Sequence, residues 1–287
     1  MSDYPTGNEK KFNEFLVIEY LKHGSVDEVL KRHKFDVPIS YAGYQRILDK
    51  WGIIKAAGPN SKLTETVEFL TRFAYESVPF DRLYKKMPPS FKTSSATLYR
   101  VLSYIKEGLT RRLGTALVIT QAGMEKNILV GEDISTPRIE LGKTYRSLTI
   151  PMGFTRLRDP REDAILRVLQ QEVFSQLAVE KRLPKIVPNR PKPFMILDVA
   201  DVRVELFHLI LPKNYSKQRL FSSFKIKNHK FISVSTLTNK SRKLNLRMGI
   251  REIAVGYEKY LDAKKKNMAV NPIYYKSTIN YKLSGTS

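Results

Sequence analysis

Cysteine is absent from the 287-residue sequence, and histidine occurs at only four positions. Without cysteine the chain can form neither disulfides nor cysteine-ligated zinc or iron–sulfur sites. The histidines form no HxxxH or HExxH pair, so the sequence does not indicate a histidine-based metal site. The lack of cysteine fits a reducing compartment, and we expect a cytoplasmic protein.

Long apolar runs are also missing. The most apolar stretch, residues 194–211, is interrupted by four charged side chains, so it is too polar to span a membrane. A secretory signal has an apolar core behind its charged start. The first residues, MSDYPTGNEKK, have no such core. We therefore expect no membrane span and no membrane partner.

Acidic residues are scarce relative to basic ones. The chain has 50 Lys and Arg against 28 Asp and Glu, a net charge of +22 at pH 7, and 42% of its residues are hydrophobic. That composition is typical of a folded globular protein. Residues 201–287 carry 18 of the basic residues and only 5 of the acidic ones. An excess of this size favours a polyanionic partner, and we expect nucleic acid.

The N-terminal residues have the pattern of three short helices. Residues 9–22 are amphipathic, and Ser25 and Ser40 are typical N-cap residues for two further helices. A turn containing Pro38 joins these two helices. In the third helix, four apolar residues recur at i, i+3, i+4 and i+7 and predict one buried face. They are Tyr44, Ile47, Leu48 and Trp51.

The pattern returns 54 residues later in the chain. Six residues of the first copy have identical counterparts in the second, and capping and core positions are among them. Asp27, Lys31, Ser40, Ala42, Arg46 and Leu48 match Asp81, Lys85, Ser94, Ala96, Arg100 and Leu102. The repeat predicts two related helical units, residues 1–60 and 61–112.

Each unit has the order helix, turn and capped helix, which is typical of a helix-turn-helix. Its second helix would bury one face and offer the other to the major groove, where small, amide and arginine side chains read base edges. Lys50 suits a phosphate contact. The candidate DNA-binding residues are Tyr41, Ala42, Gln45, Arg46, Lys50, Ser95, Tyr99 and Arg100. The alternative is two helical hairpins that only pack against a neighbour. The segment is similar to the bipartite helix-turn-helix regions of transcription regulators and of some transposases.

Residues 113–240 change to a mixed pattern of strands and one helix. A hairpin is expected at 115–120 and 127–130, a short strand at 148–151, and further strands at 194–197, 202–210 and 231–234. Between them, residues 160–178 have helical periodicity, and Pro160 suits a first helical turn.

The loop and helix in this region have a specific spacing. Gly153 is followed by five residues and Asp159, then by seven residues and Arg167. Ile150-Pro151-Met152 precedes the glycine. This spacing resembles the Nudix box, and the order of elements over roughly residues 112–240 resembles the Nudix fold, an α/β/α sandwich. The alternative is an amphipathic helix that follows a Gly-containing loop by chance.

The departures from the box concern its chemistry. In the family, helix glutamates hold a divalent metal beside a diphosphate, and the resemblance places these positions on Val168, Gln171 and Glu172. Asp159 replaces the loop glutamate, and Phe174 replaces the closing glycine. The arginine that locks the loop to the helix in the family is retained as Arg167. We therefore expect a box that persists as a scaffold, with no catalytic residues and no metal. Gly153, Asp159, Arg167, Gln171 and Glu172 would mark a ligand site or its remnant, and the resemblance implies a nucleotide or phosphosugar ligand, or a protein-contact scaffold.

Other functions stay open at this point. An active Nudix-type hydrolase would need Mg²⁺ on an unusual set, Asp159, Glu162, Asp163 and Glu172. A two-metal nuclease would use Asp198, Asp201 and Glu205, although alternation on a solvated strand explains those residues more simply. A third alternative is a basic scaffold within a nucleoprotein assembly.

Residues 241–287 are predicted to form a basic helix and tail. Ile250, Ile253, Ala254, Tyr257 and Leu261 give the helix one apolar face, and Lys264-Lys265-Lys266 begins the tail.

The preferred interpretation is an α+β multidomain protein, with an N-terminal all-α tandem helix-turn-helix followed by an α/β/α Nudix-like sandwich. We expect a protein that binds double-stranded DNA, a transcription regulator, whose second domain is catalytically degenerate. The oligomeric state does not follow from the sequence.

Overall fold

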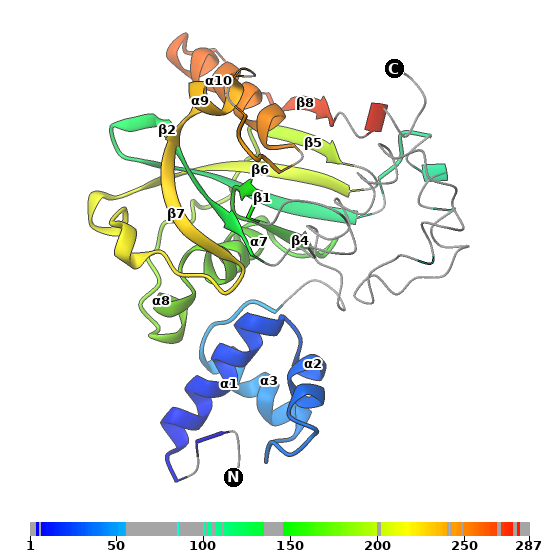
Figure 1. The fold of residues 1–287 in the computed structure, drawn as a ribbon, viewed down its shortest axis with the longest axis vertical. Helices are drawn as coiled ribbons and strands as arrows, with labels where there is room; N and C mark the ends of the chain where they lie inside the picture. Colours follow the sequence, from blue (N-terminus) through cyan, green and yellow to red (C-terminus); the bar gives the residue numbers. More distant parts are fainter. Residues whose placement is uncertain are drawn as a thin grey trace.

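The computed structural model describes residues 4–5, 7–55, 107–110, 112–134, 146–199, 202–239, 243–247, 249–268 and 271–277, together with positions 85, 100, 103–104, 241 and 280–281. Two bodies are visible, a small helical unit formed by the N-terminal residues and a larger sheet-containing domain (Figure 1).

The helical unit consists of α1 (Glu9–His23), α2 (Val26–Arg32) and α3 (Tyr41–Lys50). Both predicted caps are confirmed, because Ser25 Oγ accepts a hydrogen bond from the Glu28 amide and Ser40 Oγ accepts one from the Gly43 amide. These bonds satisfy amide groups that lack partners within the first turn of each helix.

The predicted buried face of α3 forms the centre of this unit. Tyr44 and Leu48 are fully buried, and Ile47 and Trp51 pack against the same cluster while staying partly exposed. The Tyr44 hydroxyl donates a hydrogen bond of 2.5 Å to the Leu16 carbonyl, which fixes α3 against α1.

The connection between α2 and α3 contains Pro38, as predicted, and is longer than the usual turn of a helix-turn-helix. Residues 33–40 join the two helices, whereas a helix-turn-helix usually has a turn of about three or four residues. Lys34 and Phe35 both have positive φ angles, of 53° and 59°. The unit is therefore a three-helix bundle with an extended turn before α3.

Most of the second predicted unit, residues 61–112, lies outside the described residues. Two of the candidate DNA-binding residues, Ser95 and Tyr99, are among those not described. Arg100 is described, and its side chain is exposed.

The larger domain is built on one mixed sheet. Its strands are β1 (Arg112–Gln121), β2 (Met124–Asp133), β3 (Leu148–Thr149), β4 (Met152–Thr155), β5 (Met195–Val199), β6 (Val202–Leu211), β7 (Ile226–Ser233) and β8 (Ile273–Lys276). The order is β3-β2-β1-β6-β5-β8, with β4 also paired to β1 and β7 also paired to β2. The predicted hairpin is β1–β2, and β1 runs parallel to β6.

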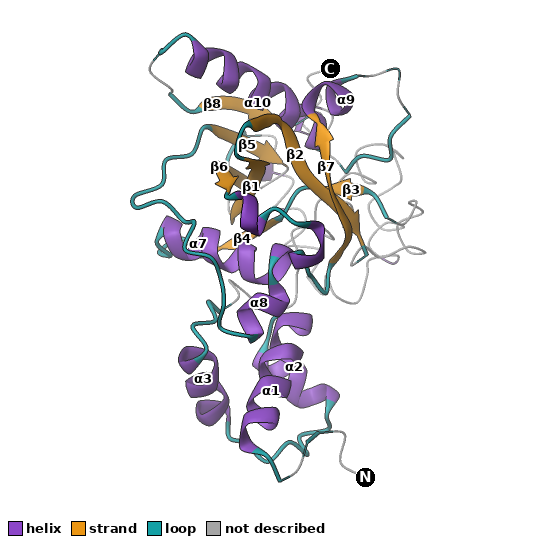
Figure 2. Ribbon diagram, turned by 90° about the vertical axis from the view of Figure 1, so that its left-hand side faces the viewer, coloured by secondary structure: helices purple, strands orange, loops and turns teal. Residues whose placement is uncertain are grey.

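Successive residues of the central strands enter two different cores. In β1, Ala116 and Val118 belong to one cluster, and Leu117 and Ile119 belong to the other. The first cluster is covered by α9 (Val234–Thr238) and α10 (Ile250–Lys265). The second is covered by α7 (Arg161–Val168), a π-helical segment (Leu169–Val173) and α8 (Ser175–Val179). Helices thus lie on both faces of the sheet, and the predicted α/β/α sandwich is confirmed (Figure 2).

Two predictions about this domain were wrong in detail. The helix predicted over 160–178 is interrupted at Phe174, whose φ of −132° is not helical. Phe174 instead forms an isolated parallel bridge with Ser222. In the predicted tail, β8 extends the sheet beside β5, whereas the predicted apolar face of α10 is buried in the sandwich as expected.

The helical unit packs against the α8 end of the sandwich, and α10 lies at the far end (Figures 1 and 2). Ala178 and Val179 of α8 belong to the hydrophobic cluster of α1–α3. Among the described residues, no helix combines the length and the apolar character that crossing a membrane requires.

Candidate functional site

The predicted reading face of α3 points away from the core of the helical unit. Tyr41 is 50% exposed, Ala42, Arg46 and Lys50 are exposed, and Gln45 is partly exposed. These five side chains lie away from the buried side of α3, which Tyr44 and Leu48 occupy. The structure therefore brings the candidate residues of the first unit together on an accessible surface.

Lys50 lies where α3 meets the sandwich. It borders a hollow of about 730 Å³ between α1, the end of α3 and the end of α8. The hollow is also lined by Trp51 and Lys181, and the Lys181 ammonium lies 3.9 Å from the centroid of the Trp51 ring. This cation–π contact holds a second positively charged side chain near the end of α3.

The box loop is held to its helix by Arg167. The side chain of Arg167 is only 4% exposed and forms an ion pair with Asp159. Its Nη1 donates a hydrogen bond of 3.3 Å to the Phe154 carbonyl. Gly153 lies on β4, where a methyl group in place of its hydrogen would lie 3.7 Å from Cγ2 of Val168, an ordinary contact. Gly153 thus lies beside Val168, the helix position that carries a metal-binding glutamate in the resembled family, with room for a methyl group between them.

Two further box residues, Gln171 and Glu172, contact Lys225, the residue that directly precedes β7. Lys225 Nζ donates a hydrogen bond of 3.0 Å to Gln171 Oε1 and lies 3.4 Å from Glu172 Oε1. Burial raises the pKa of Glu172, and the neighbouring Lys225 ammonium opposes that shift. The lysine therefore lies beside the one carboxylate that the three helix positions retain.

These donors do not fit a divalent cation. Val168 offers no ligand atom, Gln171 Oε1 is used by Lys225, and Glu172 is already paired with an ammonium group. Mg²⁺ binding requires several oxygen ligands that can turn toward the ion. Within the described part of the chain, no group of three or more His, Asp or Glu side chains could hold a metal.

Three residues of the alternative hydrolase set also have partners within the chain. Asp159 is paired with Arg167, Glu162 accepts a hydrogen bond of 2.8 Å from the Arg190 amide, and Glu172 is paired with Lys225. The partners of Asp159 and Glu172 are cations, which removes the local negative charge that a metal would need.

The carboxylates of the nuclease alternative are also committed to partners. Asp198 is buried and accepts hydrogen bonds of 3.0 and 3.2 Å from Arg203. Glu205 accepts bonds of 2.9 and 2.7 Å from Arg161. Asp201 lies outside the described residues. His208 is a satisfied strand histidine, since its Nε2 is within hydrogen-bond distance of Thr120 Oγ1 and the Tyr257 hydroxyl.

The box helix, which consists of α7 and the π-helical segment after it, also contacts the chain segment that follows α3. Arg167 Nε donates a bond of 2.7 Å to the Lys55 carbonyl. Gln170 donates a bond of 2.6 Å to the Gly52 carbonyl and accepts one of 2.9 Å from the Ile54 amide. The sandwich face that would carry catalysis is thus joined to the helical unit.

Sequence reasoning missed Gln170 and Lys225. In the sequence, Gln170 is a single polar residue in a predominantly apolar stretch. That is a weak signal for a contact between the sandwich and the helical unit. Lys225 lies 54 residues after Gln171, and nothing in its local sequence connects it to the box.

Comparisons with solved structures return Nudix proteins, each aligned over about half of this chain. A MutT protein from Methanosarcina mazei Go1 is 9% identical, with a TM-score of 0.38, and covers 55% of this chain and 97% of its own. A mutT/nudix family protein from Listeria innocua is 16% identical, with a TM-score of 0.38, and covers 55% and 99%. A C. elegans Ap4A hydrolase is 15% identical, with a TM-score of 0.35, and covers 53% and 99%.

No protein-family model and no curated protein matches the sequence. The similarity to solved structures concerns the fold and says nothing about activity at these identities. Within this chain, the strand order and the two covered sheet faces show an α/β/α sandwich. The sandwich is similar in fold to the Nudix proteins, and its box positions are engaged by a lysine, an arginine and the segment that follows α3.

Proposed function

We propose that the protein binds double-stranded DNA through α3 and that the Nudix-like domain supports this binding without hydrolysing a diphosphate. The observation that carries the proposal is the exposed face of α3, where Tyr41, Ala42 and Arg46 stand on a capped helix that is fixed by its buried side. Small, aromatic and arginine side chains on such a helix suit base edges in the major groove.

The charge of the chain supports the same partner. A net charge of +22 supplies the attraction to phosphate that dominates DNA affinity. The start of α3 is accessible on one side, since Tyr41 and Ala42 are both exposed. Regulation of transcription is the role that we propose for a sequence-reading protein of this kind.

The sandwich is proposed to be a scaffold. Its box residues bind each other and the segment after α3, so they serve to position the helical unit. A nucleotide or phosphosugar ligand at the box stays a prediction. Such a ligand would change DNA binding only if its affinity differs between two states of the protein.

Selection of bound fragments from random duplex DNA, with the full chain, tests the proposal. We expect a defined sequence motif to be enriched, because α3 presents base-reading side chains. Recovery of fragments without any shared motif would contradict sequence reading and would favour a basic scaffold of a nucleoprotein assembly.

A second assay addresses the hydrolase alternative. With Mg²⁺ and nucleoside diphosphate derivatives, we expect no release of phosphate or nucleotide. Turnover that Glu172→Gln abolishes would overturn the scaffold proposal.

A further inference from the structure

A long stretch of the sandwich contains no acidic residue. Between Glu205 and Glu252, 46 consecutive residues include 11 Lys and Arg and no Asp or Glu. Basic and acidic residues normally alternate on the surface of a globular protein. A one-sided stretch of this length creates a local positive field that attracts a polyanion.

Five of these cations are exposed on residues 213–230, which we name the basic segment. They are Lys213, Lys217, Arg219, Lys227 and Lys230. None of the five forms an ion pair with another residue that the structure describes. Two other cations of the acid-free stretch, Lys225 and Arg247, are paired with Glu172 and Asp133 instead. The exposed five therefore keep their charge available to a partner.

The basic segment is held in place by aromatic and backbone contacts. Two 3₁₀ turns, Lys213–Tyr215 and Gln218–Leu220, begin it. The Phe221 ring lies 5.8 Å from that of Phe174. The Ser222 amide donates a hydrogen bond of 2.8 Å to the Val173 carbonyl. The positive side chains thus stand on a fixed backbone, which reduces the entropy lost when they bind.

The basic segment and α3 are attached to opposite ends of the same short helix. Ser222 pairs with the start of α8, where it accepts a hydrogen bond of 3.0 Å from the Ser175 amide. Trp51, just after α3, donates a bond of 3.0 Å to the carbonyl of Val179 at the end of α8. Five residues of helix span only about 7.5 Å, a distance smaller than the roughly 12 Å width of the DNA major groove.

A direct contact joins the basic segment to the helical unit as well. Phe224 packs against the hydrophobic cluster of α1–α3, and Lys22 Nζ of α1 lies 5.7 Å from the centroid of its ring. In Figure 1 the connection between β6 and β7 descends beside the sandwich toward the helical unit.

We propose that the basic segment binds the phosphate backbone of the same DNA duplex that α3 reads. This inference rests on the proposed function and adds a second, sequence-independent contact surface to it. Fixed lysine and arginine side chains that form no ion pair within the described residues suit phosphate oxygens, and such contacts position a duplex without selecting its sequence.

The test replaces all five exposed cations of the basic segment with glutamine in the full chain. The affinity for duplex DNA is measured by fluorescence anisotropy over a series of salt concentrations. Each lost phosphate contact should reduce the slope of log K against log salt by about 0.9, so the variant should have a slope that is shallower by about 4 to 5. The ratio of affinities for selected and random duplex should stay unchanged.

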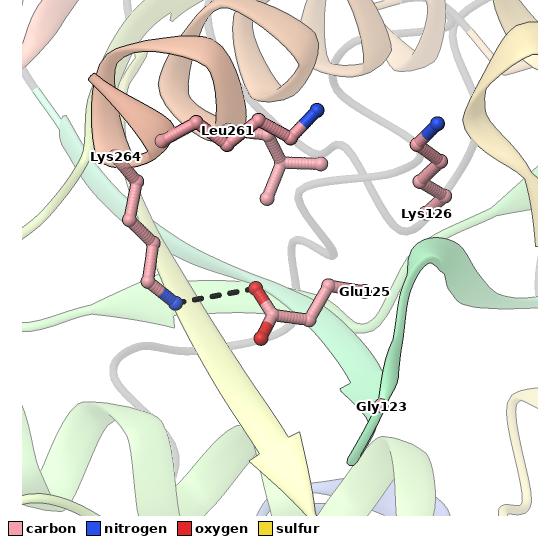
Figure 3. A pocket seen from close by; sticks show the side chains of 6 residues that line it. Gly123, Glu125, Lys126, Leu261 and Lys264 are labelled. Carbon is pink, nitrogen blue, oxygen red and sulfur yellow. Dashed lines mark hydrogen bonds and ion pairs between the residues drawn. The ribbon is translucent and has the colours of Figure 1, made fainter.

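A matched control removes the same number of charges from α10, the residue that follows it and the adjoining start of β2. It replaces five lysines near α10 with glutamine, namely Lys126, Lys259, Lys264, Lys265 and Lys266. Three of them border a hollow of about 420 Å³ between the β1–β2 turn and α10. Figure 3 shows this hollow, in which Lys264 lies 3.2 Å from Glu125. We expect the control to change the slope by less than one unit.

Two smaller variants keep the test informative if the fivefold variant does not fold. Replacing Lys213, Lys217 and Arg219 should reduce the slope by about 3, and replacing Lys227 and Lys230 should reduce it by about 2. Equal slopes for the basic-segment and control variants would overturn the inference while leaving DNA binding by α3 intact. A wild-type chain that binds no duplex at all would instead contradict the proposed function.

Discussion

The two helices that follow predicted loops in this protein, α3 and the box helix, use their polar residues in opposite ways. On α3 the side chains of Tyr41, Arg46 and Lys50 are exposed, and the helix is fixed by apolar contacts on its other side. On the box helix Arg167, Gln171 and Glu172 are buried, and each is bound to a partner within the chain.

This difference shows why residue identity alone does not assign a function. A buried polar group must be paired, because an unpaired one costs free energy. Once Glu172 is paired with Lys225, it contributes to folding and loses its freedom to bind a ligand. An exposed arginine such as Arg46, which has no ion pair with another described residue, can bind a partner at little structural cost.

The largest expected loss of stability comes from replacing Arg167, which holds the box loop to its helix. Arg167→Ala leaves Asp159 without its cation and releases both the box loop and the segment after α3. We expect the free energy of unfolding to fall by about 3–5 kcal/mol, as for other buried pairs that lose one partner. Urea denaturation measures this change. The matched change on α3, Arg46→Ala, should leave the free energy of unfolding within about 0.5 kcal/mol of the wild-type value. Equal losses for the two variants would contradict the difference between α3 and the box helix.

A smaller loss of stability is expected when Lys225 is replaced. Lys225→Met leaves the Glu172 carboxylate buried beside an apolar side chain, and we expect a cost of about 2–3 kcal/mol in the same assay, since the pair is not fully buried. Combining it with Glu172→Gln should recover at least half of this loss, because no buried charge remains. Breaking the exposed pair of Arg32 and Glu28 by Arg32→Met should cost less than about 1 kcal/mol. Strict additivity of Lys225→Met and Glu172→Gln would show that the two side chains are not coupled.

The raised pKa of Glu172 predicts a modest pH dependence. A carboxyl whose pKa is higher in the folded state than in the unfolded state favours folding when it is protonated. Its contribution is complete below the ordinary value of 4.5 and is lost as the pH rises through the folded-state pKa. The stability of wild type minus that of Glu172→Gln should therefore fall above pH 4.5, by at most about 1.4 kcal/mol per pH unit. Urea denaturation between pH 4 and pH 8 would show this, and a difference that grows with pH would have the wrong sign.

The smallest expected effect is that of added metal. Because the box donors are occupied, Mg²⁺ or Mn²⁺ should not change the melting temperature, whereas a ligand that binds the folded state raises it. A variant that restores oxygen ligands, Val168→Glu with Gln171→Glu and Lys225→Ala, should be stabilised by Mn²⁺. Stabilisation of the wild type by either ion, removed by Glu172→Gln, would contradict our account of the box.

Much of the fold could be predicted from local patterns. Ser25 and Ser40 were identified as caps because their signal lies within three residues, and the apolar spacing of α10 correctly gave its buried face. Alternation and turn residues were sufficient to identify the β1–β2 hairpin.

The features that sequence reasoning missed depend on residues far apart in the chain. The helix break at Phe174 accompanies its bridge to Ser222, and β8 forms by pairing with β5 across more than 70 residues. Lys225 reaches the box only because the approach to β7 is tied to Gln171 through Ser223, whose hydroxyl donates a bond of 2.8 Å to the Gln171 carbonyl. No local periodicity records such contacts.

The account is tested most directly by the affinity of Arg46→Ala for a selected duplex and for random duplex DNA at one fixed salt concentration. We predict that the variant loses about 1–3 kcal/mol of discrimination between the two duplexes, because a base contact is lost. The matched exposed change Arg182→Ala should leave that discrimination unaltered. An equal loss of affinity on both duplexes for Arg46→Ala would show that α3 does not read sequence.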